Sequence, residues 1–147
     1  GSFDWPFTQH CANVLPNGHL LLFDNGFNRR LDPNILLVNR YSRIVEYDIH
    51  ATNKTVSQVW EWGKAQGFGL YSVIISSAYQ LPQTGNYLLG SGFIMATTPL
   101  SARVIELAGA TKNPVFEAEL SFKNATGNGV FGWGTIDIMY RVTPFSF

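Results

Sequence analysis

One histidine near the amino-terminal end of the chain is placed best for chemistry. His10 lies in the stretch Thr8-Gln9-His10-Cys11-Ala12, ahead of a turn at Pro16-Asn17-Gly18 and an apolar strand. A neutral imidazole near pH 7 can act as a nucleophile, a base or a metal ligand, and it leaves well from a sulfuryl or phosphoryl centre. The residue type leaves these roles open, and a histidine beside a strand is often purely structural.

The other polar candidates are weaker. His19 follows a turn glycine and His50 precedes a turn, so we expect both to be solvated. No His-x-His, Cys-x-x-Cys or His-Glu-x-x-His spacing occurs, which argues against a metal site built within the chain. Arg29 and Arg30 could grip an anion through bidentate contacts, or could be solvated loop residues. Five aromatic side chains could either wall a pocket or pack between sheets: Trp5, Phe7, Tyr41, Phe68 and Tyr71.

The overall composition excludes several classes of protein. The 147 residues, 46% of them hydrophobic, suffice for one small domain or for part of a larger one. Ten basic and ten acidic residues give no net charge, which argues against a nucleic-acid binder. No apolar run approaches the ~20 residues that cross a bilayer, so we expect no membrane partner. The single cysteine, Cys11, rules out an internal disulfide.

The elements that must position His10 are almost all predicted to be β-strands. Residues 43–49 and 56–62 alternate with a period of two, as half-buried strands do. The turn at Pro16-Asn17-Gly18 joins two hairpin arms, residues 14–15 and 19–24. No segment has a convincing 3.6-residue period, so we expect little helix.

The same order of signals occurs twice along the chain. Arg103-Val104-Ile105-Glu106 repeats Arg43-Ile44-Val45-Glu46, and other blocks recur at offsets of about 60 residues. Each unit holds about four short strands in up-and-down order, which is typical of a propeller blade. We therefore predict an all-β fold, a partial β-propeller of about two to two and a half four-stranded antiparallel blades. The blade-like units cover about 8–63 and 71–121, and 130–147 adds further strands to this single domain; a self-contained β-sandwich is the alternative.

A unit of this size would leave a propeller open, because a closed ring needs at least ~4 blades. We expect the chain to be one arc of a longer protein or to pair with another copy. Gly1-Ser2 is typical of a cloning remnant, and neither an initiator methionine nor the features of a signal peptide precede Phe3. These features favour the first option.

Several short blocks occur in a specific order, and together they say more than any one of them. They are Thr8-Gln9-His10-x-Ala12, Pro16-Asn17-Gly18, Phe23-Asp24-Asn25-Gly26, the run from Tyr41 to Tyr47, and the run from Gln58 to Lys64 followed by Tyr71-Ser72. This order resembles the C-terminal part of the bacterial arylsulfate sulfotransferases. The resemblance runs from about Phe3 to about Phe93 and fades from Thr97 to Phe147.

The resemblance implies a six-bladed propeller enzyme of the periplasm that moves a sulfuryl group from an aryl sulfate to a phenol. It implies no cofactor, since the family needs no nucleotide sulfate donor, and a ping-pong reaction through a sulfohistidine. His10 matches the nucleophile, and we expect Thr8, Tyr41, Arg43 and Tyr71 to contact the substrate. Further histidines and an arginine of the family's site lie upstream of this segment. We therefore expect the isolated chain to keep the nucleophile but to have little or no turnover.

Two non-catalytic functions remain open. The first is a propeller-derived binding module for phenolic or sugar ligands, which would stack on the tryptophans Trp5, Trp60, Trp62 and Trp133. The second is an assembly unit whose open sheet edges pair to rebuild a larger ring, as a homo-oligomer or with the missing part of the propeller.

Overall fold

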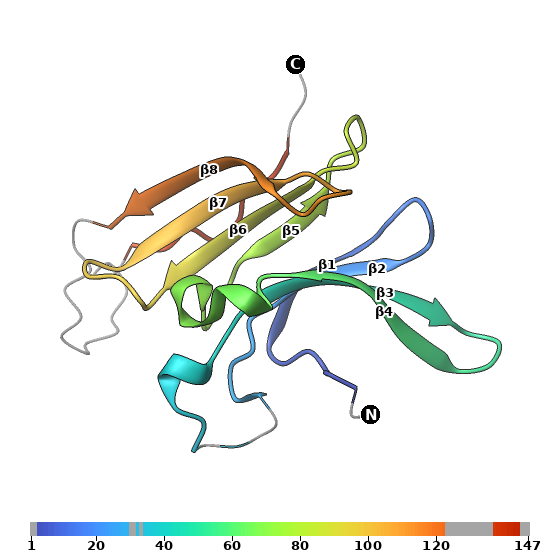
Figure 1. The fold of residues 1–147 in the computed structure, drawn as a ribbon, viewed down its shortest axis with the longest axis horizontal. Coiled ribbons are helices and arrows are strands. Elements are labelled where there is room, and N and C mark those ends of the chain that lie inside the picture. Colours follow the sequence, from blue (N-terminus) through green and yellow to red (C-terminus); the bar gives the residue numbers. More distant parts are fainter. Residues whose placement is uncertain (1–2, 30–31, 33, 123–136, 145–147) are drawn as a thin grey trace.

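The computed structural model consists of two four-stranded antiparallel sheets and describes residues 3–29, 32, 34–122 and 137–144 (Figure 1). In each sheet the strands lie side by side in chain order. The first sheet holds β1 Gln9–Val14, β2 Leu20–Asp24, β3 Arg43–His50 and β4 Thr55–Trp62. The second holds β5 Ser77–Gln80, β6 Tyr87–Ile94, β7 Ser101–Leu107 and β8 Pro114–Ser121.

The predicted fold class is confirmed. The described residues contain no α-helix, and two short 3-10 segments, η2 Leu37–Asn39 and η3 Lys64–Leu70, lie in the connections. Two up-and-down sheets that do not close on each other are the architecture of a partial propeller. No helix among these residues is long and apolar enough to span a bilayer.

The main core lies between the two sheets. Leu21 and Phe23 of β2 are fully buried in it, together with Ala78 of β5 and Leu89 of β6. Leu22, between the first two, belongs to a separate cluster on the other face of the first sheet. Side chains of a strand alternate between the faces of its sheet, so this arrangement follows directly from the period-two pattern. Each fully buried leucine or phenylalanine side chain contributes about 1.5–3 kcal/mol.

Strand β1 carries a bulge just beyond the histidine. His10 pairs with Phe23 and Asn13 with Leu21, so β1 contains one residue more than β2 between these pairs. Cys11 takes up the extra length with a φ of 53°, an uncommon conformation for a residue other than glycine. The bulge lets both the Cys11 thiol and the Asn13 amide reach the carbonyl of Ala78 in the second sheet.

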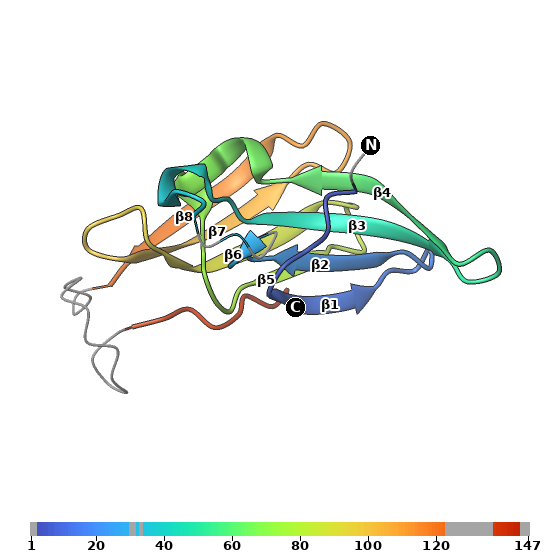
Figure 2. The ribbon, with the colours of Figure 1, turned by 90° about the horizontal axis from the view of Figure 1, so that it is seen from below.

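The last described segment, 137–144, lies against the second sheet and has no assigned strand (Figure 2). The Met139 amide donates to Gly92 O at 3.2 Å, and the Val142 amide donates to Ser77 Oγ at 3.0 Å. The sequence predicts further strands over 130–147, but 130–136 and 145–147 lie outside the described residues.

Candidate functional site

His10 is held at one ring nitrogen. It lies near the start of β1, beside the point where β2 ends, and it is half-buried. Its Nδ1 is 2.7 Å from Oδ1 of Asn25. Nε2 makes no hydrogen bond within the part of the chain that the structure describes. The ring is therefore fixed on one side and available on the other.

Asn25 connects the histidine to the segment that leads into the second sheet. It follows β2 directly and is completely buried. Its Nδ2 donates two hydrogen bonds to backbone carbonyls, one to Ser72 at 2.7 Å and one to Ile75 at 2.8 Å. Both carbonyls lie in segment 71–76, which leads from η3 into β5. The amide thus joins the end of β2 to the segment that leads into the second sheet, directly behind the imidazole.

Buried hydroxyl groups fix segment 71–76 in place. Ser42 Oγ donates to Asn25 O at 2.8 Å and accepts from the Ser72 amide at 2.9 Å. Ser72 Oγ accepts from Ser76 Oγ at 3.1 Å and from the Phe93 amide at 2.9 Å. The segment needs this support, because Ser76 has a φ of 96°, in a region that favours glycine.

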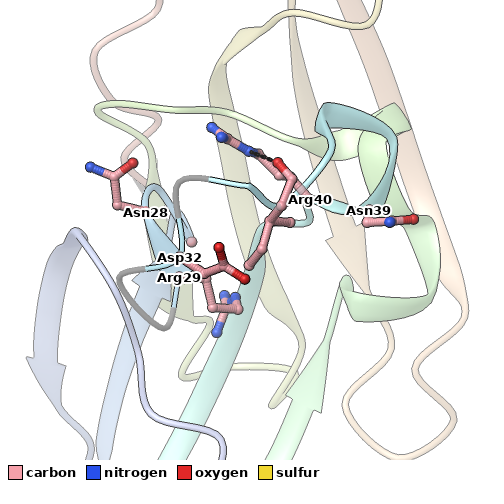
Figure 3. A pocket seen from close by; sticks show the side chains of 7 residues that line it. Asn28, Arg29, Asp32, Asn39 and Arg40 are labelled. Atoms are coloured by element: carbon pink, nitrogen blue, oxygen red, sulfur yellow. Dashed lines mark hydrogen bonds between the residues drawn. The ribbon is translucent and has the colours of Figure 1, made fainter.

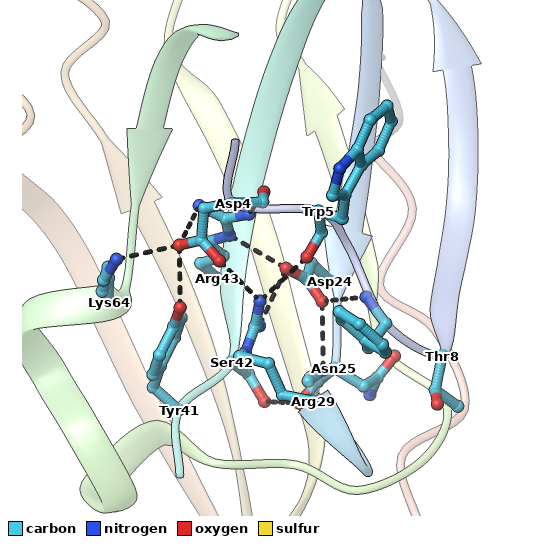
Figure 4. Close-up of polar contacts among 12 residues, drawn as sticks. Asp4, Trp5, Thr8, Asp24, Asn25, Arg29, Tyr41, Ser42, Arg43 and Lys64 are labelled. Atoms are coloured by element: carbon cyan, nitrogen blue, oxygen red, sulfur yellow. Dashed lines mark hydrogen bonds and ion pairs between the residues drawn. The ribbon is translucent and has the colours of Figure 1, made fainter. Parts of the chain in front are cut away.

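The buried carboxylate of Asp24, next to Asn25, binds the segment that leads into β1 (Figure 4). Asp24 is fully buried, and its Oδ2 accepts from Arg43 Nε at 2.9 Å and from Arg29 Nη2 at 2.8 Å. Its Oδ1 accepts from the amides of Phe7 at 2.9 Å and Gly26 at 3.1 Å. Paired in this way, a buried charge is stable, and it positions the segment that precedes His10.

Asp4 is the second carboxylate of the same network. Its Oδ2 accepts from Tyr41 OH and from Lys64 Nζ, each at 2.8 Å, and from Arg43 Nη1 at 3.2 Å. Arg29 Nη1 reaches its Oδ1 at 3.3 Å. Burial alone would raise the pKa of Asp4, but the bonds from Lys64 and Tyr41 and the two guanidinium charges outweigh it and lower the pKa to about 2. Asp4 is therefore ionised at any ordinary pH.

Two of the residues expected to contact substrate belong to this network. Arg43 is only 1% exposed, and besides its ion pairs it donates to Gln58 Oε1 and to the carbonyl of Asp4. Tyr41 gives its hydroxyl to Asp4, and the Arg29 guanidinium lies 4.1 Å above its ring. Burial is the main cause of the raised pKa of Tyr41, so its phenol stays protonated. Both side chains thus have protein partners at every polar end.

The other two expected substrate contacts are also bonded within the protein. Thr8 Oγ1 is exposed and donates to Phe27 O at 3.1 Å. Tyr71 is fully buried, and its hydroxyl accepts from Arg40 Nη1 at 3.4 Å. The structure brings His10, Arg43, Thr8 and Tyr41 to the corner Asp24-Asn25-Gly26 and the residue after it, whereas the side chain of Tyr71 bonds Arg40. The contact of the four expected residues with substrate stays a prediction.

A small cavity lies at the start of the loop that follows this corner (Figure 3). Its volume is about 20 Å³, enough for roughly one water molecule and too small for an aryl sulfate. It is lined by Gly26, Asn28, Arg29, Asp32, Ile35, Asn39 and Arg40. Of the two arginines proposed as an anion grip, Arg29 is occupied by Asp4 and Asp24, and Arg30 lies outside the described residues.

The remaining sequence candidates lie away from His10. His19 bonds Glu46 through Nδ1 at 2.6 Å and its side chain is 25% exposed, so it is only partly solvated. His50, as expected, is exposed, beside Asp48. No group of three or more metal-binding side chains occurs among the residues described. Trp60 stacks on Tyr87 at 4.1 Å between rings, Trp5 is 57% exposed, and Trp133 lies outside the described part.

Asn25 and Asp24 are the site residues that sequence reasoning missed. Both stand in the block Phe23-Asp24-Asn25-Gly26, which carries the signal but is also the ordinary composition of a turn. Asn25 lies 15 residues from His10, and Asp24 lies 5 and 19 residues from its two arginine partners. Nothing in the composition of the block indicates that one amide would hold the histidine and one carboxylate would pair two arginines.

Comparisons with known proteins identify the family of the chain. The family model Arylsulfotransferase (ASST) matches residues 1–131. The arylsulfate sulfotransferase AssT of Escherichia coli O6:H1 (strain CFT073) is 47% identical over 74 residues, and that of Lelliottia amnigena is 45% identical over 74 residues. Each alignment covers 50% of this chain but only 12% of the relative. With most of its length matched by the family model, the chain belongs to the arylsulfotransferase family.

Proposed function

We propose that the protein that carries this chain transfers a sulfuryl group from an aryl sulfate to a phenol, with His10 as the intermediate acceptor. The observation that carries the proposal is the state of the His10 ring. One nitrogen is anchored on a buried amide, while the other has no hydrogen-bond partner among the described residues. The two relatives bear the name arylsulfate sulfotransferase, which supports the choice of donor and reaction.

The proposed reaction has two displacements at sulfur. A lone pair of the imidazole forms an N–S bond while the bond from sulfur to the aryl oxygen breaks, and the departing aryloxide takes a proton from water. The oxygen of a second phenol then attacks sulfur, the N–S electron pair returns to the ring, and the phenolic proton passes to solvent. Forming a covalent intermediate divides one difficult transfer into two easier ones. No nucleotide sulfate donor or other cofactor enters either step.

The charge that develops on the sulfuryl oxygens needs hydrogen-bond donors, and the two buried arginines of the described residues are not free to supply them. Arg29 and Arg43 already share the carboxylates of Asp4 and Asp24. We propose that the donors lie in other blades of a longer, periplasmic parent protein, because each relative extends far beyond its aligned part. The isolated chain would then have the nucleophile and little or no turnover.

The test uses the intact protein with 4-nitrophenyl sulfate as donor and phenol as acceptor. Replacing the nucleophile, His10→Asn, should lower nitrophenol release by at least about 1,000-fold. The matched control is His50→Asn, which removes an exposed histidine and should leave the rate unchanged. Unchanged release in His10→Asn would end the catalytic proposal.

A groove on the outer face of the first sheet favours ligand binding as a second candidate function. It has a volume of about 300 Å³, and its walls include Phe3, Trp5, Leu22 and Tyr47. Aromatic side chains of this kind stack on phenol or sugar rings. Equilibrium titration with phenol would support this function if binding were lost in Trp5→Ala and unaffected in His10→Asn.

A further inference from the structure

We propose that Asn25 is a positioning residue that keeps the proton of His10 on Nδ1 and so makes Nε2 the atom that attacks sulfur. The inference rests on the proposed function and names one more residue on which it depends. It follows from the direction of three hydrogen bonds, all of which join at the side-chain amide of Asn25.

The orientation of that amide is fixed by its two carbonyl partners. The oxygens of Ser72 and Ile75 can only accept hydrogen bonds, so the group that faces them at 2.7 and 2.8 Å must be the NH₂ of Asn25. The group that faces His10 at 2.7 Å is then Oδ1, which can only accept. The hydrogen between Oδ1 and Nδ1 therefore belongs to the ring. A neutral imidazole that carries its proton on Nδ1 has its lone pair on Nε2.

A neutral amide suits the proposed chemistry better than a carboxylate would. When Nε2 bonds to sulfur, both ring nitrogens are substituted and the ring becomes positive. The carbonyl dipole of Asn25 stabilises that charge but cannot take up the Nδ1 proton, which stays in place through both steps. A carboxylate in its place would favour the protonated ring already before reaction, and a proton on Nε2 would block attack.

The titratable side chains described on the neighbouring strands do not bond to the His10 ring, so the positioning role falls to Asn25. The titratable residues on β1, β2 and β5, the strands packed together here, are Cys11, Asp24 and Tyr79. Cys11 points its thiol to Ala78 O, and Asp24 is held by Arg29 and Arg43. Within the described ranges, no carboxylate, lysine or arginine forms a hydrogen bond or ion pair with His10.

The first experiment reads the tautomer directly, without any assay of activity. The intact protein is labelled with ¹⁵N-histidine and measured at a pH high enough for the His10 ring to be neutral. The nitrogen chemical shifts and long-range proton couplings of His10 should then show that the ring is protonated on Nδ1. A ring protonated on Nε2 would overturn the proposal. In Asn25→Ala the signals should move toward a mixture of the two tautomers.

Asn13→Ala is the matched control for that variant. Asn13 also gives its amide NH₂ to a carbonyl of the second sheet, Ala78 O at 2.9 Å, but makes no bond to the ring. The control should leave the His10 signals unchanged. Equal changes in both variants would show that Asn25 acts only through the contact between the sheets, and would overturn the positioning role.

The second experiment measures transfer against pH in the intact Asn25→Asp variant. On the acid side of the profile, the pH at which the rate rises should shift to a higher value by about one pH unit or more. At still higher pH the rate should recover. A merely structural role would lower the rate at every pH and leave the pH of that rise unchanged, and that result would contradict the proposal. The two proposals fail separately: Nδ1 protonation with unchanged transfer in His10→Asn would leave the tautomer assignment standing and remove the proposed function.

Discussion

Tyr87 of the second sheet donates a hydrogen bond of 2.6 Å to Oε2 of Glu46 in the first sheet. Both side chains are buried, and Glu46 also accepts from His19 and Asn17 through its other oxygen. Burial by itself would raise the pKa of Glu46, but these three donors outweigh it and lower the pKa. Burial and the bond to Glu46 raise the pKa of Tyr87, so the tyrosine remains the donor.

Removing that hydroxyl should weaken the contact between the sheets. The Tyr87→Phe variant leaves one oxygen of a buried carboxylate without its donor, and a hydrogen bond to a charged group contributes about 1.5–3 kcal/mol. Urea unfolding of the intact protein should show a loss in this range. The control, Tyr140→Phe, changes a tyrosine that is 62% exposed and should cost less than 0.5 kcal/mol, roughly the limit for surface changes. Equal losses would contradict the prediction.

Stability should fall in acid partly through Asp4. Its pKa is lowered from 3.8 to about 2 in the folded protein, so its contribution is complete above the unfolded value and disappears as the pH falls toward 2. Asp4→Asn should lower stability at neutral pH and make the decline between pH 4 and 2 shallower. Urea midpoints across this range check it, with the exposed Asp137→Asn as control. An unchanged slope in Asp4→Asn would show that the carboxylate does not carry this dependence.

Breaking the buried ion pair of Arg43 and Asp24 should lower the free energy of unfolding more than breaking an exposed ion pair. Arg43→Met leaves Asp24, which is 0% exposed, with a single arginine partner, and loss of one member of a buried pair costs about 3–5 kcal/mol. For comparison, Arg103 pairs with Glu117, which is 38% exposed, and Arg103→Met should cost about 1 kcal/mol or less. Thermal unfolding ranks the two. A small loss of stability in Arg43→Met would instead favour a role for Arg43 other than stabilising the folded protein.

Gly26 should tolerate no side chain. It has a φ of 73°, and a Cβ there would collide with the carbonyl of Tyr41. Gly18 has a similar φ of 86° with nothing within 4 Å of a Cβ, so Gly18→Ala measures the backbone strain alone, about 1–2 kcal/mol. Gly26→Ala should cost clearly more, as measured by urea unfolding. Equal costs would mean that the Tyr41 carbonyl moves away freely.

The strands with simple alternation could be predicted from the sequence. Residues 43–49 and 56–62 are predicted as strands, and the structure has β3 Arg43–His50 and β4 Thr55–Trp62. Their alternation reports which side chains face the core, and this information is local. The turn before β2 could also be predicted from the sequence, and in the structure the Gly18 amide donates a hydrogen bond to Leu15 O at 2.9 Å.

The strand that carries the histidine was harder to find. The sequence indicates only residues 14–15 as the first hairpin arm, whereas β1 begins at Gln9. The positive φ angles of Thr8 and Cys11 break the alternation there, and neither residue type announces such a conformation. The role of Asn25 escaped for a different reason: its carbonyl partners lie 47 and 50 residues further along the chain, and only the folded pair of sheets brings them together.

The amide behind His10 is bonded to the backbone of the segment that leads into the second sheet, and this limits which part of the protein can be moved to another scaffold. An engineer who moved only the hairpin of β1 and β2 to a new scaffold would carry the imidazole without its anchor, and the ring would be free to turn. The smallest portable unit comprises both sheets together with the serine-rich segment between them. In design terms, the anchored imidazole depends on the junction between the two sheets, and strand β1 alone does not hold it.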